Sequence, residues 1–195
     1  ARADQHRAFK RFDSAEKDYN LAKVWGADPG SVKKGIKAIR LSRRDAALNS
    51  GDSYGNAGEF EMASRSYDEA ERLGANPELI SSRRHELKVS EAKYLINNGQ
   101  VEKAENFLLD WEMLGYEGPE LETLRRALAV KRIELLEGKA RQLIQSGQFN
   151  EAEEFLVDWE LSEEGVSRIP AMYAYMKELK KNDMKRRWDE ILSKI

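Results

Sequence analysis

The chain has no cysteine, only two histidines and only four prolines among its 195 residues. The absence of cysteine excludes disulfides, thiol nucleophiles and thiolate-bound metals. His6 and His85 lie far apart, and no His-x-x-x-His or Glu-x-x-His spacing occurs, so we interpret both as surface residues rather than metal ligands or acid–base catalysts. We therefore predict no catalytic residues, no metal site and no cofactor, and interpret the chain as not an enzyme.

Long apolar runs and an excess of one charge are also missing. No apolar stretch approaches the ~20 residues that a membrane span needs. Charged residues make up 35% of the chain but leave a net charge of only −2. This disfavours binding to nucleic acid or membrane mainly by electrostatic attraction. Residues 2–10 have the pattern of a helix whose beginning is missing, so we expect a piece of a larger protein. Nothing in the sequence selects a compartment or an oligomeric state.

The few prolines and glycines divide the chain into helices. Pro29 and Pro77 each follow a good N-cap residue, Asp28 and Asn76, and Pro119 and Pro170 also precede long helical patterns. Glycines stand where helices should end in left-handed turns: Gly26, Gly74, Gly115 and Gly165, with a tighter type of turn at Gly58, Gly99 and Gly147. The chain thus alternates long helices with short ones.

Apolar residues recur with helical rather than alternating spacing, so we predict an all-α fold. The predicted helices cover residues 1–10, 12–25, 29–57, 59–73, 77–98, 101–114, 119–146, 149–163 and 170–194. Glycines near the end of the third helix, Gly51 and Gly55, predict an interruption there.

Three segments, 58–74, 99–115 and 147–163, repeat one pattern, and residues 11–26 repeat it without the leading glycine. Ala15, Ala63, Ala104 and Ala152 occupy the same place in each. Two of the intervals between them are equal, and the third is shorter by about two helical turns, which preserves the face of the helix. Such self-similarity is typical of a solenoid, in which each unit buries its apolar face against the next.

The second unit resembles a tetratricopeptide repeat (TPR). Its small and aromatic residues follow that family's order: Gly51, Tyr54, Gly58, Phe60, Ala63, Tyr67, Ala70 and Pro77. The repeat is longer than the family's, and Trp111 and Trp159 stand where the family prefers a small residue, so we expect a divergent member with long first helices. The resemblance implies a right-handed superhelical solenoid in a single domain, with units at 1–26, 29–74, 77–115 and 119–164 and a terminal helix at 170–195.

The resemblance also implies a function and a site. In TPR arrays the first helix of each pair lines a concave binding face. Here the analogy places five polar residues on that face: Asp52, Asn56, Lys93, Asn97 and Arg141. We therefore expect a scaffold that binds a peptide or a partner protein along its concave face.

Three further interpretations stay open. Trp111 and Trp159 either pack between repeats, which their core-facing spacing favours, or form an aromatic ligand box. The basic stripe of Lys33, Lys37, Arg40 and Arg44 either pairs with acidic short helices or binds an anionic partner, RNA or an acidic peptide. The absence of aromatic residues between its basic residues favours the first interpretation. The array as a whole could instead be the accessory region of a larger enzyme.

Overall fold

The structure, a computed structural model, describes residues 2–194. Helices account for 84% of the chain, and no strand occurs in the described part. The prediction of an all-α fold is confirmed. None of the helices within residues 2–194 is long and apolar enough to cross a membrane.

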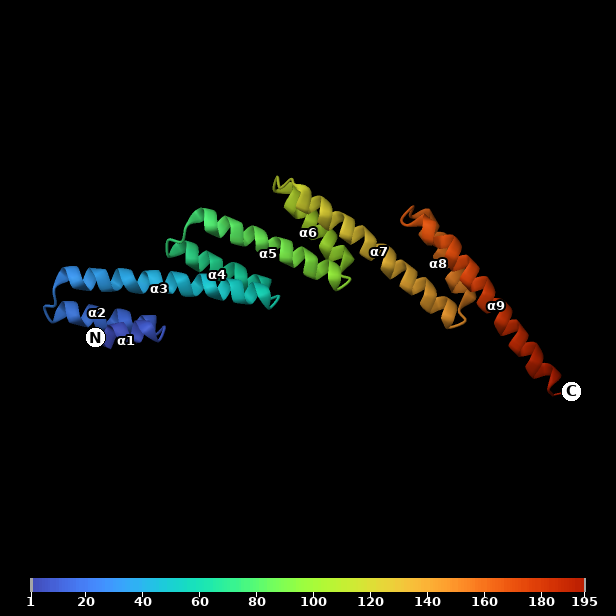
Figure 1. Cartoon of the computed structure of the whole chain (residues 1–195), viewed down its shortest axis with the longest axis horizontal. Coiled ribbons are helices and arrows are strands. Elements are labelled where there is room, and N and C mark those ends of the chain that lie inside the picture. Colours follow the sequence, from blue (N-terminus) through green and yellow to red (C-terminus); the bar gives the residue numbers. More distant parts are fainter. Residues whose placement is uncertain (1, 195) are drawn as a thin grey trace. The chain divides into compact units, whose positions relative to one another are not determined.

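Long and short helices alternate along the chain (Figure 1). After α1 (Arg2–Ala8), the short helices are 13 residues long in each case: α2 (Phe12–Val24), α4 (Phe60–Arg72), α6 (Val101–Met113) and α8 (Phe149–Leu161). The long ones are α3 (Pro29–Asn56), α5 (Pro77–Asn97), α7 (Pro119–Gln145) and α9 (Ile169–Leu192). A 3-10 turn, η1 (Val166–Arg168), precedes α9 and was not predicted.

The helix ends follow the predicted capping chemistry. The Asp28 carboxylate accepts a hydrogen bond from the Ser31 backbone N–H at 2.8 Å, and the Asn76 side chain accepts one from Glu78 at 2.7 Å. Both contacts satisfy N–H groups that the first turn of a helix leaves without a partner. All seven predicted turn glycines have a positive φ, between 61° at Gly165 and 89° at Gly74, which a residue with a Cβ rarely adopts.

The contacts divide the chain into two compact units, one ending at Tyr94 and the other beginning at Leu95. In the first unit, α3 packs against both α2 and α4. The core between α4 and α5 contains buried side chains from both helices and their connection: Ala63, Tyr67, Ala70, Ala75, Ile80 and Leu87. The short helix α4 therefore supports two long helices at once.

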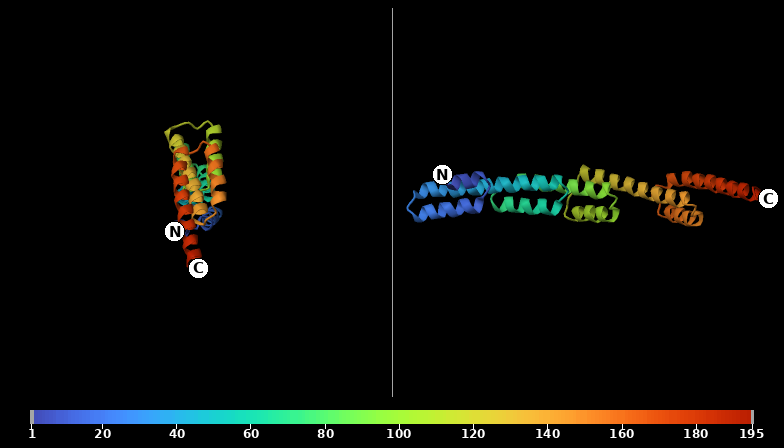
Figure 2. Two further views of the ribbon diagram at one scale, coloured as in Figure 1. Left: turned by 90° about the vertical axis from the view of Figure 1, so that its right-hand side faces the viewer. Right: turned by 90° about the horizontal axis from the view of Figure 1, so that it is seen from below.

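In the second unit, α8 packs against both α7 and α9, which the two views of Figure 2 show together with Figure 1. Buried residues of all three helices form its core: Ala140, Ile144, Ala152, Leu156, Trp159, Ile169, Met172 and Met176. The second unit thus repeats the arrangement in which a short helix lies against the long helices before and after it.

The repeated alanines lie on the buried face of the short helices. Ala15, Ala63, Ala104 and Ala152 are each 0% exposed. Each is in the first turn of its helix, and its N–H donates to the carbonyl of the residue that precedes the helix, at 2.9–3.0 Å. Their complete burial confirms that this position belongs to the core.

Basic side chains of the long helices pair with acidic side chains of the short helix before them. Four pairs show the pattern: Arg43 with Asp13, Arg84 with Asp68, Arg132 with Glu105 and Lys180 with Glu153. Exposed ion pairs contribute little each, about 0–1 kcal/mol. These pairs match the interpretation that basic residues of the long helices pair with acidic residues of the short helices.

The predicted interruption of the third helix is wrong, because α3 continues through Gly51 and Gly55 to Asn56. Gly51 is needed for packing rather than for a turn. A Cβ at this position would lie 2.4 Å from Cε1 of Tyr67, so the absent side chain makes room for the tyrosine ring. Gly35 receives the ring of Tyr19 from α2 in the same way, at 2.2 Å.

This packing predicts opposite effects for the same substitution at two helical glycines. Gly51→Ala should destabilise the protein by about 1–3 kcal/mol, because the Tyr67 ring must move. Gly138→Ala should stabilise it by roughly 0.5–1 kcal/mol, since a Cβ on Gly138 of α7 meets nothing within 4 Å and alanine favours a helix. Denaturant midpoints measure both, and a neutral or stabilising Gly51→Ala would contradict the tight contact.

Candidate functional site

A cavity of about 230 Å³ opens between α3 and α5 in the first unit. We call it the α3–α5 groove. Three helices line it with a mixture of polar and apolar residues: Asp52, Gly55, Asn56, Tyr67, Arg83, Glu86, Leu87 and Ser90. Tyr67 comes from α4, which contacts α3 and shares a buried core with α5. The groove therefore exists because the short helix holds α3 and α5 in position.

A polar network crosses this groove. The Tyr67 hydroxyl donates to Asp52 Oδ1 at 2.8 Å, and Arg83 Nε lies 3.4 Å from the same oxygen. Arg83 also donates from Nη1 to Glu86 Oε2 at 3.1 Å. Burial, together with the bond to Asp52, raises the pKa of Tyr67 well above its ordinary value. Tyr67 therefore remains a protonated donor and keeps the Asp52 carboxylate oriented towards Arg83.

The lining of the groove contains both hydrogen-bond acceptors and donors. Its carboxylates, Asp52 and Glu86, accept hydrogen bonds, while Arg83, Asn56 and Ser90 can donate them. An extended peptide presents both kinds of group along its backbone. Among residues 2–194, no group of three or more His, Asp and Glu side chains is placed to hold a metal ion.

The structure brings together two of the five predicted site residues. Asp52 and Asn56 both line the α3–α5 groove. Lys93 and Asn97 are exposed and lie one turn apart on α5. Arg141 belongs to the second unit, where it donates to Glu137 Oε1 at 2.7 Å and its guanidinium lies 5.9 Å from the Tyr175 ring centre.

None of the α5 residues that line this groove, Arg83 and Ser90 among them, was one of the five predicted site residues. Both lie on the same side of α5 as Glu86, at helical spacings that place all three on one face. The sequence contains that spacing. It does not show that α3 lies opposite this face, so the signal alone could not select these residues.

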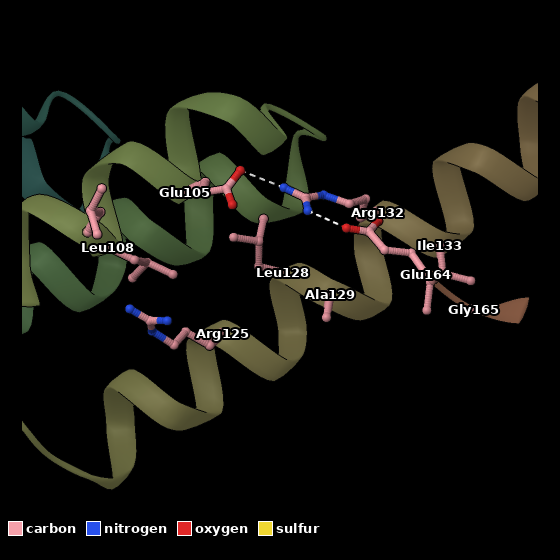
Figure 3. Close-up of a pocket in the computed structure, with 10 residues that line it drawn as sticks. Glu105, Leu108, Arg125, Leu128, Ala129, Arg132, Ile133, Glu164 and Gly165 are labelled. Carbon is pink, nitrogen blue, oxygen red and sulfur yellow. Dashed lines mark hydrogen bonds and ion pairs between the residues drawn. The ribbon is translucent and has the colours of Figure 1, made fainter. Parts of the chain in front are cut away.

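A second cavity, of about 420 Å³, lies in the other unit between α6, α7 and the turn after α8 (Figure 3). We call it the α6–α7 pocket. Apolar side chains form much of its wall: Leu108, Leu109, Leu128, Ala129 and Ile133. The sequence analysis did not predict it, because the wall combines residues from three separate segments.

Arginine side chains border the α6–α7 pocket. Arg132 donates to Glu105 on α6 and to Glu164 beyond α8, both at 2.6 Å, as the dashed lines in Figure 3 mark. The hydrogen bond to Glu164 raises the pKa of Arg132 above its ordinary value. Arg125 pairs with Glu112. These pairs connect α7 to α6 and to the α8–α9 turn, so we interpret this border as structural.

The two repeated tryptophans are packed inside the protein. Trp111 is 4% exposed and Trp159 is 2% exposed. The Trp159 indole N–H donates to the Glu164 carbonyl at 2.6 Å, and the Trp111 ring stacks on Tyr116 with centres 4.4 Å apart. Neither residue lines the α3–α5 groove or the α6–α7 pocket. This favours the packing interpretation over the ligand box.

The basic stripe is partly used within the fold. Arg40 donates to the Leu73 carbonyl at 3.1 Å, at the end of α4, and Arg44 donates to Asp45 at 2.7 Å. Lys33 and Lys37 are exposed. His6 is beside Asp18, with 3.8 Å between Nε2 and Oδ2. Arg40 thus has a packing role, and His6 has the contact of a surface residue.

Comparison with known proteins identifies no relative: no protein-family model, curated protein or solved structure matches the chain.

The burial of the tryptophans predicts two classes of fluorescence. Trp25 is 83% exposed and Trp188 is 64% exposed, whereas Trp111 and Trp159 are buried. In a Trp25→Phe, Trp188→Phe variant, emission should shift to shorter wavelength and resist quenching by acrylamide. Trp159→Ala in that background should destabilise the protein by about 3–5 kcal/mol. Readily quenched, red emission from the double variant would favour the ligand box instead.

Proposed function

We propose that this chain is a non-catalytic scaffold that binds a peptide or a partner protein, built as a right-handed superhelical solenoid of TPR-like hairpins. The observation that carries the proposal is the α3–α5 groove, where Asp52 and Asn56 from α3 face Arg83, Glu86 and Ser90 from α5. Asp52 and Asn56 are two of the five residues that the resemblance to TPR arrays implied for the concave face.

The repeated architecture supports the solenoid part of this proposal. The four short helices have the same length of 13 residues and carry their buried alanine at the same place. Within each unit a short helix lies between successive long ones. Solenoids of this kind expose a long surface formed by equivalent helices, which suits an extended partner.

The chemistry of the groove supports a peptide as the ligand. Carboxylates on both long helices can accept peptide N–H groups, and Arg83, Asn56 and Ser90 can donate to peptide carbonyls. Leu87 and the Tyr67 ring add apolar surface to the lining of the groove. An RNA partner has less support, because Arg40 and Arg44 of the basic stripe are engaged within the protein. A scaffold of this kind can also serve as the accessory region of a larger enzyme.

A matched pair of substitutions on α5 tests the groove. Peptides are first selected from a random library for binding to the unmodified chain. Ser90→Arg places a long side chain in the groove and should weaken these peptides by at least about tenfold, or 1.4 kcal/mol. Ser81→Arg introduces the same side chain at an exposed position outside the groove and should change affinity by less than about twofold.

The same peptides test the other predicted residues. Lys93→Glu combined with Arg141→Glu reverses two exposed charges and should weaken binding of acidic peptides without changing the denaturation midpoint. Peptides that bind all three variants as tightly as the unmodified chain would place the binding surface elsewhere.

A further inference from the structure

The second half of α9 exposes a stripe of large apolar side chains. Met184 is 58% exposed, Trp188 64%, Ile191 51% and Leu192 63%. Their spacing places the first three on one face of the helix. We call these four residues the α9 stripe. Exposed apolar residues are ordinary when isolated, but a contiguous stripe that includes a tryptophan marks an interaction surface.

The first half of the same helix is covered. Ile169, Met172 and Met176 are buried in the core that α9 forms with α7 and α8. The α9 stripe lies further along the same helix and about 100° around its axis from Met172 and Met176, so it forms a second face of α9. Within residues 2–194, nothing comparable buries the stripe.

The long helix α7, in the same unit, has a face equivalent to the α9 stripe, and other helices cover that face. Counted from the proline at the start of each helix, Met172 of α9 corresponds to Leu121 of α7, and both are buried. By the same count, Met184 corresponds to Ile133 and Ile191 to Ala140.

On α7 this face is occupied. Ala140 is buried in the core with Ala152, Leu156 and Trp159 of α8, and Ile133 packs against that core. The side chains that α7 buries against a short helix therefore have exposed equivalents on α9. Two faces of α7 are packed against other helices, and the equivalent of its second face is exposed on α9.

The charges around the α9 stripe indicate what kind of helix fits it. Helical geometry places Lys181 and Lys185 along one border and Lys180 and Arg187 along the other. Lys180 already reaches Glu153 of α8 at 3.3 Å. The α8 segment, residues 147–165, contains seven acidic residues and no lysine or arginine: Glu151, Glu153, Glu154, Asp158, Glu160, Glu163 and Glu164.

We propose that the α9 stripe is the docking site for an acidic amphipathic helix with the chemistry of α8. Its apolar face would carry a small residue, a leucine and a large aromatic residue at the spacing of Ala152, Leu156 and Trp159. The small residue allows close approach beside Ile191, and the aromatic residue packs against the stripe. The acidic flanks face the lysines. This site is separate from the α3–α5 groove and does not depend on peptide binding there.

The test uses the full chain and a synthetic helix as the probe. The probe is the peptide of residues 147–164 carrying Trp159→Phe, so that it does not contribute tryptophan fluorescence. The chain carries Trp25→Phe, which leaves Trp188 as the one exposed tryptophan of the remaining three. Titration with the probe should shift the Trp188 emission to shorter wavelength and saturate, because the helix covers the indole ring.

Two variants of the chain decide where the probe binds. Ile191→Glu adds to the α9 stripe a negative charge that repels the acidic probe, and should weaken its binding at least about tenfold. Leu161→Glu makes the same change at a side chain that is 76% exposed at the end of α8, and should leave the affinity unchanged. Circular dichroism should show both variants folded, since both positions are exposed.

A probe in which the glutamates are replaced by glutamine should bind more weakly and lose most of its dependence on salt. The proposal is overturned if the Trp188 emission does not saturate or if Ile191→Glu binds the probe unchanged. It is also overturned if the chain alone self-associates, as measured by sedimentation, and Ile191→Glu abolishes this, because the stripe then binds a second copy.

Discussion

Tight packing at one position of the short helices is the constraint on which the rest of the structure depends. Ala15, Ala63, Ala104 and Ala152 occupy this position with no exposed surface, so a larger side chain there would have to displace its neighbours. Where a large side chain does enter a contact, its partner is smaller still, as Gly51 is for the Tyr67 ring. Interiors at native density leave little room for adjustment at such crossings.

The candidate binding groove follows from this packing. The helix α4 contacts α3 and also shares a core with α5, so it holds the two long helices on either side of the α3–α5 groove. Tyr67 of α4 lines this groove. The hydroxyl of Tyr67 then orients Asp52, and Asp52 orients Arg83. A residue that fills the core thus also determines the polar pattern offered to a partner.

Much of this fold could be predicted from the sequence because its determinants are local. Caps such as Asp28, turn glycines and helical periodicity act within a few residues, and the buried alanines and tryptophans repeat visibly. The continuity of α3 through Gly51 could not, because the reason is the Tyr67 ring on another helix. The α6–α7 pocket and the groove residues Arg83 and Ser90 were missed for the same reason: they depend on which helices lie opposite each other.

The central claim is that the packing of the short helices requires a small residue at this repeated position. Enlarging that residue tests the claim most directly. Chemical denaturation of Ala63→Leu, Ala104→Leu and Ala152→Leu should show each one destabilised by about 1–3 kcal/mol, because the added methyl groups overpack a buried position. Ala127→Leu, at an exposed site on α7, is the control and should change stability by less than about 0.5 kcal/mol. Midpoints for the three buried variants that match the control would contradict the account.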